Sequence, residues 1–105
     1  MENEILYQSV KTGETVFIDY YIIPENISAE YCDLKYYGIR IEKTAIYPGG
    51  GKIVESNQIN NVFYRYDDIK EFLQVIAKRR TEPVELLGEV EKYIAESIDR
   101  ARETA

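Results

Sequence analysis

The chain has 105 residues, of which 45% are apolar and 30% are charged, and it contains ten tyrosines but no histidine. This length is typical of one domain with its own hydrophobic core, and the composition excludes a disordered polyelectrolyte and a collagen-like fibre. The formal net charge of −6 argues against a non-specific nucleic-acid binder, because such proteins use a surplus of basic residues to neutralise phosphates.

A β-hairpin is predicted near the N-terminus. Ile5 to Val10 and Thr15 to Ile23 are rich in β-branched and aromatic residues, and a short segment with Gly13 separates them. Pro24 is predicted to close the second strand, because proline cannot donate a hydrogen bond to a neighbouring strand.

A third strand is predicted from Cys32 to Ile46. Apolar residues alternate with polar or small ones from Tyr37 onwards, whereas before Tyr37 the apolar positions have the opposite parity. A β-bulge near Gly38 would restore both halves to one face, and glycine is the residue expected at such a kink.

The glycine-rich turn that follows has one feature of a phosphate-binding loop. Gly49, Gly50 and Gly51 precede Lys52, so exposed amides and an ammonium group lie close together. A true P-loop has the spacing GxxxxGK[ST] and continues as a helix, whereas here a fourth strand is predicted from Lys52 to Ile59. We interpret the segment as a hairpin turn, with a loop that contacts an anion or a partner as the alternative.

The first helix is predicted from about Asp68 to Arg79. Asp68 with Glu71 fits a capping box, and Asp67 is an alternative cap. The basic run Lys78 to Arg80 lies at the negative end of the helix, which explains it without any nucleic acid. The residues expected to face the core are Ile69, Phe72, Leu73 and Ile76.

The second helix is predicted to start almost immediately. Thr81 or Glu82 is the expected cap, and Pro83 occupies the first turn. Gly88 is unfavourable in a helix by about 1 kcal/mol relative to alanine, so it is expected to mark a close crossing with the first helix or the sheet. The predicted apolar stripe comprises Val84, Leu87, Val90 or Glu91, Ile94 and Ile98, widened by Leu86 and Tyr93.

The predicted fold is therefore α+β, with the element order ββββαα. A four-stranded, mainly antiparallel sheet is expected to pack both C-terminal helices on one face, as a two-layer sandwich. Residues 1–105 form a single domain, with a β-rich half (1–64) and a helical half (65–105).

The residue types present argue against an enzyme. Without histidine the chain lacks the commonest general base and zinc ligand, and its single cysteine, Cys32, allows neither an internal disulfide nor a Cys/His zinc site. We expect no cofactor and no metal, and we expect Cys32 to be a small buried apolar residue. Asp19 and Asp33 lie in predicted strands, and a buried carboxylate would be a candidate site.

A cytoplasmic location is also expected. A lone cysteine suits a reducing compartment, and the acidic N-terminus lacks the basic start and the apolar run of a signal peptide. No apolar stretch is long enough to cross a membrane.

Tyrosine is the unusual component of this sequence. If the helices cover one face of the sheet, Tyr21 and either Tyr36 or Tyr37 are expected to form an exposed aromatic patch on the other face. The alternative is ordinary sheet surface, on which aromatic residues form cross-strand pairs. RNA-binding sheets also carry aromatic residues, but they combine them with basic residues, which argues against RNA here.

Four short motifs carry a family resemblance. They are Tyr37-Gly38-Ile39, Glu55-Ser56, Asp68-Ile69 and the segment Glu82 to Leu86. With these motifs the segment from Tyr37 to Ile98 resembles a family of short uncharacterised proteins from clostridia and related Firmicutes. The resemblance implies no assigned activity and transfers no functional residue.

Two functions remain open from the sequence. The first is a non-enzymatic cytoplasmic protein-interaction or regulatory module that associates with itself, with a homodimer as the expected symmetry. The alternative is a small-ligand-binding domain with a tyrosine-lined pocket between the sheet and the helices.

Overall fold

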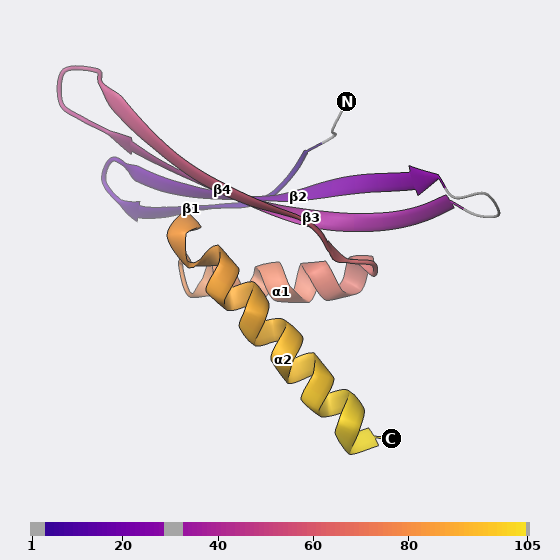
Figure 1. Cartoon of the computed structure of the whole chain (residues 1–105). Coiled ribbons are helices and arrows are strands. Elements are labelled where there is room, and N and C mark those ends of the chain that lie inside the picture. Colours follow the sequence, from indigo (N-terminus) through magenta and orange to yellow (C-terminus); the bar gives the residue numbers. More distant parts are fainter. Residues whose placement is uncertain (1–3, 29–32, 105) are drawn as a thin grey trace.

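The computed structural model describes residues 4–28 and 33–104 and has the predicted ββββαα order (Figure 1). A short 3-10 helix, η1, lies between the two α-helices. The elements in chain order are β1 Ile5–Gly13, β2 Val16–Ser28, β3 Asp33–Ile46, β4 Lys52–Phe63, α1 Tyr66–Lys78, η1 Pro83–Glu85 and α2 Leu86–Thr104.

The four strands form one antiparallel sheet in the order β1-β2-β3-β4, so each strand pairs with its neighbour in sequence. The prediction that Pro24 ends the second strand is wrong, because β2 continues to Ser28. The β1 pairing stops at Ile22, so beyond this point β3 is the only described strand beside β2. Proline is tolerated at such an edge, where one side of the strand needs no donor.

The bulge predicted in the third strand lies instead in the fourth. Pairing between β2 and β3 is regular from Asp33 to Ala45. Between β3 and β4, however, Tyr37 pairs with Phe63 and Ile39 pairs with Ile59, so β4 carries extra residues at this point. A Cβ atom at Gly38 would lie 2.7 Å from the Ile59 carbonyl oxygen, so Gly38 makes room for the irregularity of β4.

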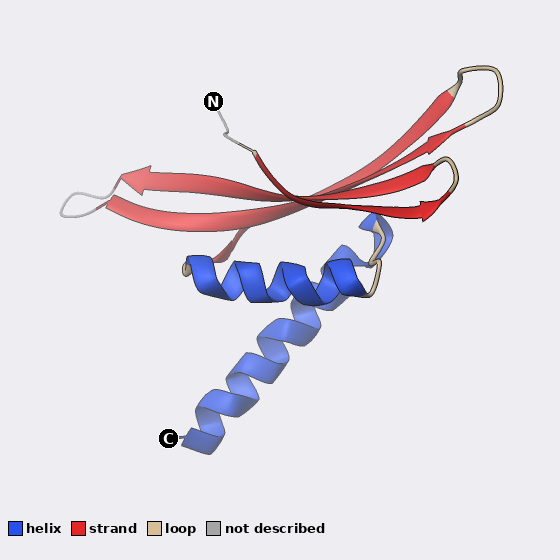
Figure 2. Ribbon diagram, turned by 180° about the vertical axis from the view of Figure 1, so that it is seen from behind, coloured by secondary structure: helices blue, strands red, loops and turns tan. Residues whose placement is uncertain are grey.

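Both helices lie against one face of the sheet, which we call the covered face (Figure 2). Alternate residues of β2 and β3 point into this layer and meet the apolar side of α1. The predicted core side of α1 is confirmed, since Ile69, Phe72, Leu73 and Ile76 are all buried. The most deeply buried core residues of the sheet are Ile18, Tyr20, Ile22, Ile39 and Ile41.

The ends of α1 differ from the capping prediction. The helix begins at Tyr66 after Arg65, which makes no side-chain cap hydrogen bond, so the Asp68 capping box is absent. Asp67 and Asp68 lie in the first turn, where their charges favour the positive end of the helix. At the other end, Arg80 adopts a left-handed conformation with φ of 56° and reverses the chain.

The start of the second helical segment is confirmed as predicted at Glu82. Its side chain accepts the amide hydrogen of Glu85, while the Glu85 side chain accepts that of Glu82 at 3.0 Å. The Glu82 carboxylate also pairs with the Lys43 ammonium group on β3, which ties this turn to the covered face.

A buried hydrogen bond joins the sheet to the same turn. The Tyr20 hydroxyl, on the central strand β2, donates to the Thr81 carbonyl oxygen at 2.8 Å, and both residues are buried. Burial, reinforced by the nearby Glu85 and Glu82 carboxylates, raises the pKa of Tyr20 to about 12.

Replacing Tyr20 by phenylalanine is expected to destabilise the protein by about 1–3 kcal/mol, because the Thr81 carbonyl loses its buried donor. The folded protein holds this phenol protonated beyond its ordinary pKa of about 10, so its contribution is complete below that pH and falls as the pH rises towards 12. Urea unfolding of the original protein and of Tyr20→Phe, at neutral pH and at pH 11, measures the loss of stability and its dependence on pH. An equal loss of stability in the two proteins between these pH values would contradict the assignment.

Candidate interaction surface

The face of the sheet opposite the helices, the open face, carries Tyr21. The Arg40 guanidinium lies over its ring, 5.6 Å from the ring centroid, so the ring is half-buried. Partial burial raises the pKa of Tyr21, and the nearby Asp19 and Glu42 carboxylates raise it by smaller amounts. Tyr21 is therefore part of a charged surface layer and not of an exposed apolar patch.

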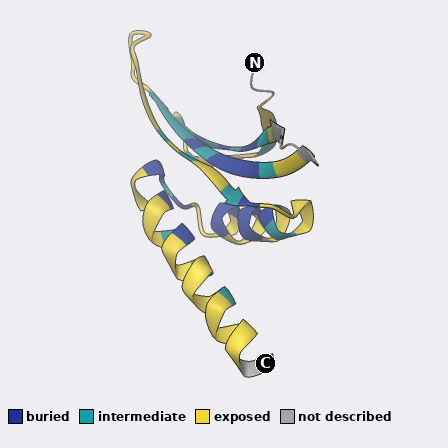
Figure 3. Ribbon diagram, turned by 45° about the vertical axis from the view of Figure 1, so that its right-hand side comes forward, coloured by how far each residue is buried: buried dark blue, intermediate teal, exposed yellow. Residues whose placement is uncertain are grey.

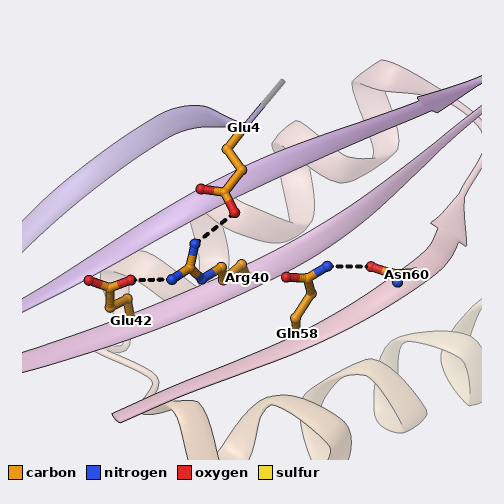
Figure 4. A network of polar contacts seen from close by, with 5 residues as sticks. All are labelled: Glu4, Arg40, Glu42, Gln58 and Asn60. Carbon is orange, nitrogen blue, oxygen red and sulfur yellow. Dashed lines mark hydrogen bonds and ion pairs between the residues drawn. The ribbon is translucent and has the colours of Figure 1, made fainter. Parts of the chain in front are cut away.

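Arg40 is the centre of this layer (Figure 4). It forms ion pairs with Glu4 at 2.7 Å and with Glu42 at 2.5 Å, and the hydrogen bond with Glu4 raises its pKa. On the neighbouring strand, the Gln58 amide donates to the Asn60 side-chain oxygen at 2.7 Å. These donors and acceptors satisfy one another, which is typical of a solvated sheet face.

The structure separates Tyr36 from Tyr37. Tyr37 lies on the covered face, where it is only 8% exposed and meets the Tyr66 ring at 5.6 Å. Tyr36 lies on the open face with Tyr21 and is half-buried. The pairing register places Tyr21 opposite Arg40 and Tyr36 opposite Glu25, so the two rings are four residues apart along the sheet.

The glycine-rich loop is the tip of the hairpin between β3 and β4. Gly49 and Gly50 have positive φ values of 99° and 96°, which glycine adopts without strain. The Gly50 amide donates to the Tyr47 carbonyl at 3.2 Å, and the Tyr47 amide donates to the Gly51 carbonyl at 2.7 Å. Lys52 then opens β4, so the loop continues into a strand and lacks the helix of a P-loop.

The two candidate carboxylates are far apart. Asp19 is half-buried on the open face and accepts a hydrogen bond from the Ser9 hydroxyl at 2.5 Å. Asp33 opens β3 opposite Ser28, nine residues further along β2 from Asp19, or about 30 Å. Cys32 lies outside the described residues.

The second helix departs most from the prediction. Its expected core stripe is largely exposed, with Leu87 55%, Ile94 46% and Ile98 48% accessible, and Val84 just before the helix 83% accessible. Of the predicted stripe, the residues that face the core are Val90 and Leu86, with Tyr93 packed at the margin.

The physical reason for this difference is the direction of α2. The helix slopes away from the sheet, so its C-terminal half projects beyond the body and is mostly exposed (Figure 3). Gly88 was expected to mark a close crossing, but a Cβ atom there would meet nothing within 4 Å. Packing inside the chain does not explain this glycine.

A cluster of three aromatic rings anchors α2 to the body. Phe63 at the end of β4 lies 5.3 Å from Phe72 of α1 and 5.1 Å from Tyr93 of α2, and Phe72 lies 5.4 Å from Tyr93. Burial, with a smaller contribution from Asp68, raises the pKa of Tyr93. Beyond this cluster α2 slopes away from the sheet (Figure 1).

One side of α2, from its first turn into the projecting half, presents what we call the exposed face of α2. Each of its members is exposed to solvent, and together they form a mainly apolar strip that runs for about four turns. The members are Leu87, Glu91, Ile94, Ala95, Ile98 and Arg102.

An apolar groove adjoins this face. It has a volume of about 310 Å³ and lies between α2 and the segment that links β4 to α1. Val62, Phe63 and the 74%-exposed Tyr64 line one side, and Tyr93, Ile94 and Ile98 contribute to the other. Tyr64 and Tyr93 thus contribute two tyrosine rings to the lining.

Sequence reasoning assigned the large apolar residues of the exposed face, Leu87, Ile94 and Ile98, to the core. The width of the apolar surface of α2 argued against that assignment. The apolar residues of α2 occupy two adjacent stripes, one through Leu86, Val90 and Tyr93 and one through Leu87 and Ile94. Together these stripes are wider than the roughly 100° that a helix needs for packing on one side. The apolar surface of α2 is therefore wider than the part that the body covers.

In the part of the chain that the structure describes, no helix is long and apolar enough to cross a membrane, and no three metal-ligating side chains gather.

Comparisons with known proteins place the chain in a family. No curated protein and no solved structure matches the sequence. One family model matches residues 1–96, which extends the resemblance to the N-terminal hairpin. The chain therefore belongs to DUF6514, a family of unknown function.

Proposed function

We propose that this chain is a non-enzymatic, cytoplasmic protein-interaction module, and that the exposed face of α2 is its contact surface. The observation that carries the proposal is the exposure of Leu87, Ile94 and Ile98 on one strip of a helix that projects from the body. Large apolar side chains gathered on one strip favour a protein partner, because monomeric proteins rarely leave contiguous apolar surface uncovered.

The remaining surfaces favour a partner less. On the open face of the sheet, Arg40 covers the Tyr21 ring and is itself paired with two carboxylates, so that face is polar. Ile53 and Val54, near the start of β4, are also exposed, but they belong to the regular pairing of β4 with Ala45 and Thr44 of β3. The cytoplasmic part of the proposal is supported by the single cysteine among 105 residues.

Site-specific photocrosslinking in the native host tests the proposal. A photoreactive phenylalanine analogue at Ile94 is expected to give one discrete crosslinked product, because this side chain would lie inside the contact. The matched control carries the analogue at Ile53, which is 51% exposed on the hairpin tip, and should give no such product. No product at Ile94, or the same product at both positions, would overturn the proposal.

The groove beside α2 favours a second candidate function, the binding of a small apolar ligand. Its volume of about 310 Å³ lies at the lower end of the range of about 300–1,000 Å³ that is usual for ligand sites. A thermal-shift screen of metabolites tests this alternative. A shift that is lost when Ala101, which lines the groove, is replaced by tryptophan would support it, and no shift in the screen would remove it.

A further inference from the structure

Two opposite charges interrupt the apolar strip of α2. Glu91 and Arg102 are eleven residues apart, so on an α-helix they lie within about 20° of the same line and about 16 Å apart. Both are exposed, and neither takes part in an ion pair between described residues. Within the described part of the chain, each charge therefore lies beside apolar members of the strip without an ion-pair partner.

From this pattern we infer that the partner of the exposed face is a second copy of the chain, whose α2 lies antiparallel on it. The inference rests on the proposed function and names its partner. In an antiparallel pair, Glu91 meets Arg102 of the second copy, and Arg102 meets Glu91 of the second copy. A two-fold axis between residues 96 and 97 generates both pairs at once, as expected of an isologous dimer.

The same register fits the apolar residues. It places the small Ala95 opposite Ile98 of the second copy, and the reverse, so that the large Ile98 faces a small residue near the axis. A parallel pair would bring Glu91 against Glu91 and Arg102 against Arg102 in an apolar seam, which costs energy. The order of the charges along α2 thus selects the antiparallel arrangement.

The shape of the chain leaves room for this pair. The C-terminal half of α2 projects away from the sheet and both hairpins, so a second helix can approach it without meeting the body (Figures 1 and 3). In the antiparallel register the body of the second copy would lie beyond the C-terminal end of α2, at the opposite end of the dimer.

The chain as a whole exposes more surface than a compact monomer of its size, and the projecting α2 contributes to this excess. The chain exposes 7317 Å², whereas a compact monomer of 12.3 kDa exposes about 6,100 Å². The excess is larger than the roughly 800 Å² that each partner buries in a standard interface. The radius of gyration, 15.8 Å against about 13 Å for a compact chain of this length, indicates the same excess.

Analytical ultracentrifugation of the purified full chain over a concentration series tests the inference. We expect a concentration-dependent dimer, and we expect Ile98→Asp to abolish it. Glu91→Arg alone and Arg102→Glu alone should each weaken association by about tenfold or more, because each creates two like-charge contacts. The double variant E91R/R102E should restore association to near the original level, since it exchanges the two partners of each pair.

Two controls make the outcome specific. Ile53→Asp removes an equally exposed apolar side chain from the hairpin tip and should leave the dimer unchanged. Circular dichroism melts of each variant show that a loss of association is not a loss of folding. A chain that stays monomeric at high micromolar concentration, a dimer that tolerates Ile98→Asp, or a double variant weaker than both single variants would each overturn the inference.

The failure of this inference is distinguishable from failure of the proposed function. If the purified chain is monomeric but the crosslinker at Ile94 captures one different protein, the exposed face of α2 is still an interaction surface, and the partner is not a second copy. If the crosslinked product has twice the mass of the chain, both proposals are supported. If Ile94 gives no product, the proposed function itself fails.

Discussion

Replacing Gly38 by alanine is expected to destabilise the fold by about 2–3 kcal/mol, in the upper part of the range for overpacking. The added Cβ atom would lie 2.7 Å from the Ile59 carbonyl oxygen and 3.0 Å from the Asn60 Cα atom. Both obstacles are backbone atoms of the bulged strand β4, so no side-chain rotation can relieve the contact. Denaturant unfolding monitored by circular dichroism measures the change in the free energy of unfolding.

Gly13 provides the matched control for this substitution. It also lies in the sheet, but a Cβ atom there would meet only Val16 side-chain atoms, the nearest at 3.7 Å, which is ordinary contact. Gly13→Ala is therefore expected to change stability by about 0.5 kcal/mol or less. Equal effects at the two glycines would contradict the close approach of the β4 backbone to Gly38.

Gly38 also shows how far sequence reasoning could go with the sheet. The residue types indicated that this glycine marks an irregularity, and the structure agrees that it does. Which strand carries the extra residues depends on the pairing between β3 and β4, and single-strand periodicity does not contain that information. Pro24 was misjudged for the same reason, since its tolerance depends on where β1 stops pairing with β2.

The helices show the same division between local and non-local information. The Glu82 cap and the core side of α1 were predictable because they depend on residues three or four positions apart. The burial of α2 was not predictable, because it depends on the angle between the helix and the sheet. Periodicity grouped Ile94 and Ile98 with the core side of α2, whereas the structure leaves both exposed.

The aromatic cluster of Phe63, Phe72 and Tyr93 determines that angle. It is the main contact between α2 and the body beyond the first turns of the helix, where Leu86 and Val90 are buried. The cluster therefore links the stability of the fold to the position of the exposed face of α2. Removing a ring of the cluster should therefore destabilise the projecting helix more than the centre of the sheet.

Phe72→Ala is accordingly expected to cost about 3–5 kcal/mol of unfolding free energy, because it opens a cavity among three rings and the core. Hydrogen exchange should in addition show that the amides of α2 lose more protection than those of β2 and β3, since α2 loses one of its few anchors. Val75→Ala, on the same helix but 42% exposed, is the control and should change stability by about 0.5 kcal/mol or less. A loss below about 1 kcal/mol for Phe72→Ala, or a uniform loss of protection across sheet and helix, would mean that contacts other than the cluster hold α2 in place.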